Sequence, residues 1–208
     1  MVRLQGPFQI IRTDRRAYLL VNAFVYGTLL LGLALGALFP NLHAARTASF
    51  ANGSQGALVE KVFTHPWVFG GIIFLVNVFP TALLLITIPS LVIPFAGLAV
   101  FAVKTFDLGL TLAPVDRTTA LTLIPHSLTL LIEFQAYVLV MFGAYLLGRS
   151  WLRPATVDVT THREGYACGL RLLGCLWRPA LALFVVGATY EAFEIYFLVP
   201  RVLGVAHG

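Results

Sequence analysis

Long apolar runs separated by short polar stretches dominate this chain of 208 residues. Several runs reach about 20 residues, the length at which an α-helix crosses the roughly 30 Å hydrocarbon core of a bilayer. Such runs must fold as helices, because lipid offers the backbone no hydrogen-bond partner. The pattern predicts an all-α, polytopic transmembrane helical bundle. About five crossings are expected, at residues 17–39, 67–88, 95–112, 121–147 and 179–199.

The apolar stretch 67–113 is too long for one crossing and about right for two. Pro80 is expected to kink the first crossing, and Pro89 and Pro94 are expected to enclose a tight turn between the two. A re-entrant hairpin is the alternative, because prolines at membrane depth also break helices that line protein or water.

The polar stretches divide the chain further. Residues 1–16 are predicted to be a cytoplasmic interfacial segment, and residues 17–208 a single transmembrane domain. Residues 41–66 are expected to form a polar loop, and part of 155–178 a surface helix. Gly32 and Gly36 have the spacing of a close helix contact.

Composition agrees with a membrane location. The chain is 59% hydrophobic and 11% charged, whereas a soluble domain has about 25% charged residues. The net charge of +5 does not indicate nucleic acid, because most arginines flank apolar segments. With five crossings, nine basic residues lie on the side of the N-terminus and four on the other side. The positive-inside rule therefore predicts an N-in, C-out orientation. A prokaryotic inner membrane is the location that we expect.

Several polar residues fall inside the predicted crossings. Glu133 follows His126 by seven residues, which places both on nearly the same helix face about 10 Å apart. Pro125 suits a first helical turn, which would aim a helix N-terminus at His126. Lys104 and Asp107 are three residues apart and are expected to form an internal ion pair. The remaining polar residues at this depth are Asn77, Gln135, Glu191 and Glu194.

This polar cluster has two interpretations. Ionisable side chains are costly at membrane depth, so they usually mark helix contacts, relays or ion pathways. A hydrogen-bonded cluster that fixes helix register is the simpler interpretation, and a proton or cation site is the alternative. The sequence contains no motif for a zinc protease, a nucleophile elbow or a phosphate loop. We therefore predict no enzymatic activity, no cofactor and no metal.

The same region resembles the stage II sporulation protein M family of integral membrane proteins, over roughly residues 67–200. The resemblance rests on Asn77, on the Pro125-His126 step before a helix, on the segment from Glu133 to Arg149, and on Glu191-Ala192. Ser127 replaces the glycine of the family pattern, and Glu133 follows the histidine by seven residues instead of four. Membership would imply a membrane component of an envelope complex.

The sequence thus gives two expectations for function. The first is an integral membrane scaffold or anchor subunit of an envelope complex, as the resemblance implies. The second is a transporter or permease-like subunit with an intramembrane proton or cation site. Membrane lipids and other membrane or envelope proteins are the expected partners, and a homo-oligomer is left open.

Overall fold

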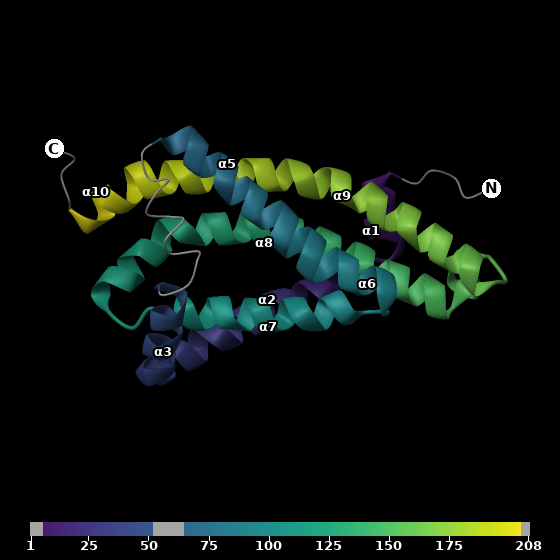
Figure 1. The fold of residues 1–208 in the computed structure, drawn as a ribbon, viewed down its shortest axis with the longest axis horizontal. Coiled ribbons are helices and arrows are strands. Elements are labelled where there is room, and N and C mark those ends of the chain that lie inside the picture. Colours follow the sequence, from purple (N-terminus) through teal and green to yellow (C-terminus); the bar gives the residue numbers. More distant parts are fainter. Residues whose placement is uncertain (1–5, 52–64, 205–208) are drawn as a thin grey trace.

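The structure is a computed structural model that describes residues 6–51 and 65–204, and all its regular elements within these ranges are helical. In chain order the elements are α1 (Pro7–Thr13), α2 (Arg15–Leu38), α3 (Pro40–Ala51), α5 (Pro66–Val76), the π-helix η1 (Asn77–Thr87), α6 (Ile88–Val92), α7 (Ala96–Thr111), α8 (Arg117–Leu152), the 3-10 helix η2 (Pro154–Val157), α9 (His162–Phe193), the π-helix η3 (Glu194–Leu198) and α10 (Val199–Leu203). The long helices lie side by side as an elongated bundle (Figure 1).

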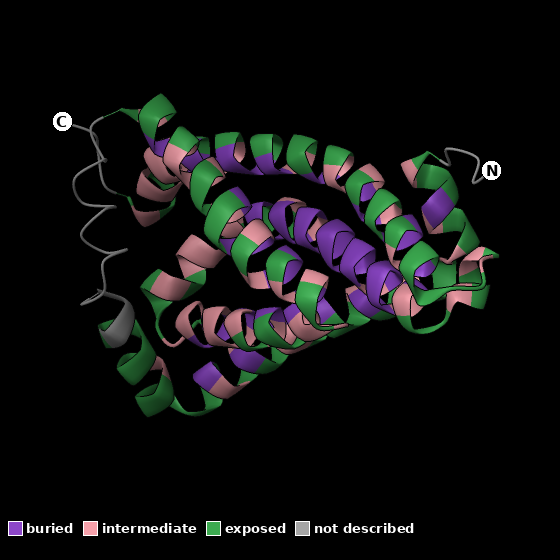
Figure 2. Ribbon diagram, turned by 45° about the vertical axis from the view of Figure 1, so that its right-hand side comes forward, coloured by how far each residue is buried: buried purple, intermediate pink, exposed green. Residues whose placement is uncertain are grey.

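Helix α8 forms the centre of this bundle. In its most apolar window 78% of the residues are buried, whereas the corresponding windows of the other long helices are 28–33% buried. Figure 2 shows α8 as the most continuously buried helix, surrounded by helices with exposed outer faces. Leu20, Leu30 and Val185 are among the large apolar side chains on those outer faces. An apolar surface of this extent needs a hydrocarbon environment, which agrees with a membrane protein.

Four helical stretches are long and apolar enough to cross a membrane. They are Arg15–Leu38, Pro66–Val92, Arg117–Leu152 and His162–Leu203. The predicted crossing at 95–112 corresponds to α7, whose 16 residues span about 24 Å. This helix is shorter than a usual crossing. It nevertheless packs along the membrane-length helix α2 (Figure 1).

The contact between α2 and α7 depends on small residues. A Cβ atom at Gly32 would meet the Phe106 carbonyl oxygen and would lie 3.0 Å from the Gly109 Cα atom. One helical turn later, Gly36 lies against Leu110 and Ala113. The predicted close packing at Gly32 and Gly36 is thus confirmed, with α7 as the partner.

The turn between α6 and α7 lies later than predicted. The helix continues through Pro89 to Val92, and the chain reverses at residues 93–95. Phe95 has a φ of 67°, a left-handed conformation that is unusual for a bulky residue. Its ring lies against Gly148, where a Cβ atom would be 2.7 Å from the ring, and 5.8 Å from the ring of Tyr145. Packing against α8 therefore holds this turn.

Two predicted helix starts are wrong. Helix α8 begins at Arg117, where Asp116 and Thr119 form a reciprocal capping box, so Pro125 lies inside the helix and not in its first turn. The helix N-terminus is therefore about 12 Å from the level of Pro125. Helix α9 begins at His162 with a capping box between Thr161 and Glu164.

Helix α9 also passes through Pro179, so the predicted surface helix and the predicted last crossing are one helix. A proline is tolerated inside a membrane helix where neighbouring groups compensate for the lost hydrogen bond.

Two further differences concern the N-terminal half. The predicted polar loop at 41–66 begins as helix α3, whereas residues 52–64 lie outside the described ranges. The interfacial segment contains the helix α1, and Asp14 separates α1 from α2. Asp14 accepts two hydrogen bonds from Arg149 at 2.5 and 2.9 Å, which ties the start of α2 to the end of α8.

Candidate functional site

One face of α8 carries four polar side chains toward α9. His126, Thr129, Glu133 and Tyr137 follow one another at intervals of three or four residues, so they form one line along the helix. Glu133 is 8% exposed and Thr129 is 1% exposed. Their partners come from α9, η3 and η1.

The first group of contacts surrounds Glu194 at the start of η3. The Nδ1 atom of His126 lies 3.1 Å from Glu194 Oε1, and the Thr129 hydroxyl donates to Glu194 Oε2 at 2.5 Å. The side chain of Glu194 is 1% exposed. Both of its carboxyl oxygens thus have a partner within the protein.

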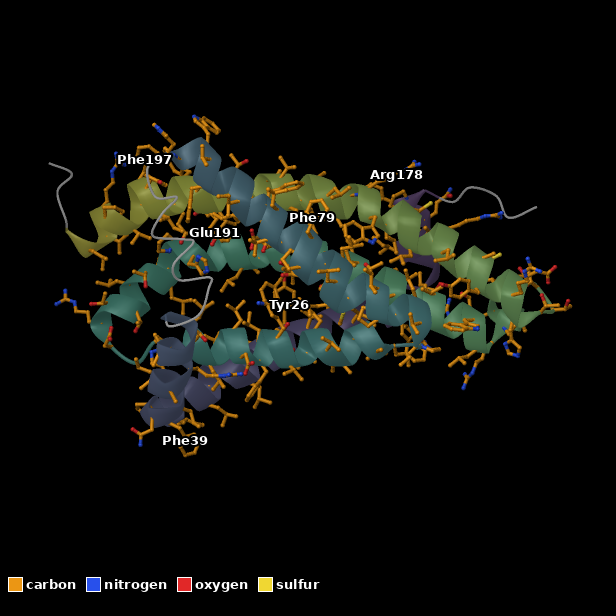
Figure 3. All side chains as sticks on the ribbon, in the orientation of Figure 1. Tyr26, Phe39, Phe79, Arg178, Glu191 and Phe197 are labelled. Atoms are coloured by element: carbon orange, nitrogen blue, oxygen red, sulfur yellow. The ribbon has the colours of Figure 1, made fainter. Side chains whose placement is uncertain are left out.

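The second group lies deeper in the bundle, around Glu133. Asn77 donates from Nδ2 to Glu133 Oε1 at 2.5 Å and accepts from the Tyr137 hydroxyl at its Oδ1 atom, at 2.7 Å. The carboxyl group of Glu133 also interacts with that of Glu191, which comes from α9. Figure 3 shows Glu191 in the region between α9 and α8.

A glycine on α9 makes room for this second group. A Cβ atom at Gly187 would lie 2.5 Å from Glu133 Cγ and 3.3 Å from Glu133 Oε1. Any larger residue would therefore displace the Glu133 side chain. Gly187 and Thr129 were not predicted as site residues, although both lie one turn from a predicted site residue on the same helix face.

Two π-helical segments present site residues. Asn77 is the first residue of η1, and Glu194 is the first residue of η3. Pro80 lies inside η1, so the expected irregularity occurs there as a π-helix. Within η1, the Thr87 hydroxyl donates to the Ala82 carbonyl at 2.9 Å, which supports the altered backbone. Short π-helical segments are frequent at functional sites.

A cavity of about 240 Å³ reaches the cluster from the end of the bundle where α7 and α8 meet. Its walls combine threonine side chains with the two site residues His126 and Glu194. The full set of lining residues is Thr111, Leu112, Thr119, Thr122, Leu123, His126, Glu194, Ile195 and Val199. The volume is several times the roughly 30 Å³ that one water occupies in the liquid, and the walls provide polar partners. The cavity therefore has room for water beside His126 and Glu194.

Gln135 does not belong to this cluster, although it was predicted to. Its Oε1 atom accepts from Tyr18 at 2.9 Å, and its Nε2 atom donates to Asn22 at 2.8 Å and to Tyr26 at 3.1 Å. All three partners lie on α2, and Figure 3 shows Tyr26 apart from Glu191. Gln135 therefore ties α8 to α2 on another face.

The predicted pair of Lys104 and Asp107 is not formed among the described residues. Asp107 instead binds Arg46 of α3 through both carboxyl oxygens, the Arg46 Nε contact being 3.1 Å. The competing partner comes from a segment that the sequence analysis assigned to a loop. This contact fastens α3 to α7 and lies outside the cluster.

The cluster thus brings together five of the six predicted residues, namely Asn77, His126, Glu133, Glu191 and Glu194. No lysine or arginine contacts its three carboxyl groups among the described residues. Two carboxylates that face each other at membrane depth repel each other, so either one of them binds a proton or the pair binds a cation. Within residues 6–51 and 65–204, no three His, Cys, Asp or Glu side chains converge as ligands of one metal ion.

Comparisons of this chain with models of protein families, with curated proteins and with solved structures find no match.

Proposed function

We propose that this chain is a multi-pass membrane subunit of the transport type, which takes up a proton or a cation at the cluster formed by Glu133, Glu191, Glu194, His126 and Asn77. The observation that carries the proposal is the cavity beside the cluster. A cluster that served only to fix helix packing would have no need of access from water, whereas an ion site needs access from at least one side.

The proposed topology has five crossings, with the N-terminus inside and the C-terminus outside. The parallel course of α7 along α2, with Gly32 beside Gly109 and Gly36 beside Leu110 and Ala113, supports the fifth crossing, because the first and third crossings run in the same direction. The basic residues near the N-terminus, the end of α8 and the start of α9 support the orientation. The plasma membrane of a prokaryote is the proposed location.

The proposal is tested by proton flux in liposomes. Purified protein is reconstituted with a pH-sensitive dye inside, and a potassium gradient with valinomycin imposes a potential. We expect wild-type protein to carry protons and Glu133→Gln to lower the rate at least tenfold, because the amide keeps the hydrogen bonds but cannot release a proton. Glu164→Gln is the matched control, since glutamine also serves at this position of a capping box.

Equal flux in the Glu133→Gln and wild-type proteins would refute the assignment of Glu133. Absence of flux in wild-type protein would be followed by the same assay with sodium, potassium and magnesium gradients. If none of these cations moved, the transport proposal would be wrong.

A second candidate function is the scaffold that the family resemblance implies. The observation that favours it is a groove of about 760 Å³ between α5 and α9, bordered by Trp67, Gly71, Ala188 and Phe193. Small residues in its floor would let a helix of another membrane protein approach closely.

The scaffold candidate is tested by gentle purification from the native membrane and mass spectrometry of the bound proteins. The scaffold candidate would be supported if an envelope protein binds wild-type protein in stoichiometric amount and is absent from the purified Gly71→Leu variant. Gly27→Leu is the control, because a Cβ atom at either glycine meets no other atom within 4 Å. Retention of the same partner by both variants would exclude the groove as its binding site.

A further inference from the structure

The cavity at the meeting point of α7 and α8 has a histidine at its inner end. His126 lines the cavity, and its side chain is 20% exposed. Its Nδ1 atom faces Glu194 Oε1, whereas no hydrogen bond from the described residues reaches its Nε2 atom. Glu194 also lines the cavity, but its side chain is only 1% exposed, so the imidazole is the more accessible of the two groups and lies in contact with the carboxyl group.

We propose, on the basis of the function proposed above, that the ion is a proton and that His126 relays it from the cavity to Glu194. The hydroxyl groups of Thr111 and Thr122 donate to helix carbonyl groups, and their oxygen atoms can still accept hydrogen bonds from water in this entry port. The carboxyl pair of Glu133 and Glu191 is the acceptor beyond it.

The transfer needs no partner other than water. A proton from a hydronium ion binds Nε2 of neutral His126, while the proton on Nδ1 passes to the carboxylate of Glu194. Water is left in the cavity, Glu194 is neutral, and the imidazole is neutral in its other tautomer. After Glu194 has passed its proton to Glu191, rotation of the ring about its Cβ–Cγ bond turns the protonated Nε2 toward Glu194 and the bare Nδ1 toward the cavity, which prepares the ring for the next proton.

The acceptor lies one helical turn away. Glu191 precedes Glu194 by three residues on a continuous helix, so both side chains lie on one face with Cβ atoms about 5–6 Å apart. Glu191 in turn interacts with Glu133. The carboxyl groups therefore form a path from the port into the interior.

The donors around the carboxyl groups favour a proton over a metal ion. Glu194 already accepts from Thr129 and faces His126, and Glu133 accepts from the amide nitrogen of Asn77. A cation such as sodium needs oxygen ligands turned toward it, whereas N–H and O–H groups point at these oxygens.

The port is tested by thiol accessibility in a background without the native free cysteines, Cys168→Ala and Cys175→Ala. Thr122→Cys places a thiol in the cavity wall. Ile124→Cys is the matched control, because Ile124 lies within about 3 Å of the same depth and is 65% exposed on the outer face. In oriented vesicles, we expect a membrane-impermeant maleimide to label Thr122→Cys at least tenfold faster than Ile124→Cys, and from one side only.

The relay is tested in the same liposome assay with His126→Gln, whose amide can still hydrogen bond to Glu194. We expect at least a tenfold loss of proton flux, together with unchanged labelling of Thr122→Cys. Wild-type flux in His126→Gln would overturn the relay.

The labelling and flux experiments fail in different ways. Proton flux in wild-type protein without labelling of Thr122→Cys would overturn the port and leave the transport function standing. Labelling of Thr122→Cys with no flux of any ion in wild-type protein would overturn the transport function and, with it, the proton relay.

Discussion

Replacing Gly32 by alanine tests whether α7 is packed inside the bundle as the structure describes. The new Cβ atom would meet backbone atoms of α7, including Gly109 Cα at 3.0 Å and Leu110 N at 3.1 Å. Backbone atoms cannot move aside as a flexible side chain can, so α2 and α7 must separate. Gly27→Ala is the control on the same helix, because its Cβ atom meets no atom within 4 Å.

The expected size follows from overpacking. Forcing an extra methyl group into a closely packed contact costs about 1–3 kcal/mol. Alanine also gains up to about 1 kcal/mol over glycine within a helix, and Gly27→Ala receives this gain without the clash. The two variants should therefore differ by about 2 kcal/mol. For a chain of this size, this difference corresponds to roughly 4–8 °C in the unfolding temperature.

The assay is thermal unfolding of each purified variant in a mild detergent, followed by a thiol-reactive dye and by size-exclusion chromatography. We expect Gly32→Ala to unfold at a lower temperature than wild type and Gly27→Ala to unfold at an equal or higher temperature. Equal unfolding temperatures of the two variants would refute the close contact of α2 with α7, and with it the support for a fifth crossing.

Two further predictions concern contacts outside the cluster. Replacing Gln135 by leucine removes three hydrogen bonds to α2. Since each is worth roughly 0.6 kcal/mol within a membrane, the variant should be less stable by about 2 kcal/mol. Thermal unfolding in detergent measures this loss, and an unchanged unfolding temperature would contradict the hydrogen bonds of Gln135. The hydrogen bond from the backbone N–H of Thr119 holds the pKa of the Asp116 carboxyl group below its ordinary value. The charged cap therefore stabilises the protein above about pH 4. This stabilisation is lost as the pH falls through the lower pKa of the folded state. Asp116→Asn should keep the cap and unfold with a weaker pH dependence below pH 4, and an identical pH profile would contradict the role of the carboxylate.

The membrane-crossing helices could be predicted largely from the sequence, because hydrophobic length sets them directly. Their ends could not be predicted where proline was taken as a boundary. Pro125 and Pro179 both lie inside long helices, since capping boxes upstream had already started these helices. The capping residues Asp116 and Thr161 mark these helix starts in the sequence, but they lie outside the apolar runs from which the helices were predicted.

Most residues of the candidate site could be predicted from the sequence, but the residues that they contact could not. Helix periodicity places His126 and Glu133 on one face, yet it does not say which helix lies opposite. Gln135 is only two residues from Glu133, and this spacing turns it toward α2 instead of α9. Asp107 binds Arg46, which is distant in sequence and lies on a helix that was not predicted.

The backbone of the two helices that flank the cluster gives a second observation, besides the cavity, that supports the proposed function. Both helices leave α-helical geometry at a site residue, η1 at Asn77 and η3 at Glu194. Pro80 inside η1 accounts for part of its irregular hydrogen bonding, whereas η3 contains no proline. Asn77 contacts Glu133, and Glu194 contacts His126, so the first residue of each segment makes a contact that defines the cluster. Two irregular helical segments thus contribute residues to one cluster beside the cavity, and the frequent occurrence of π-helical segments at functional sites supports the ion pathway proposed above.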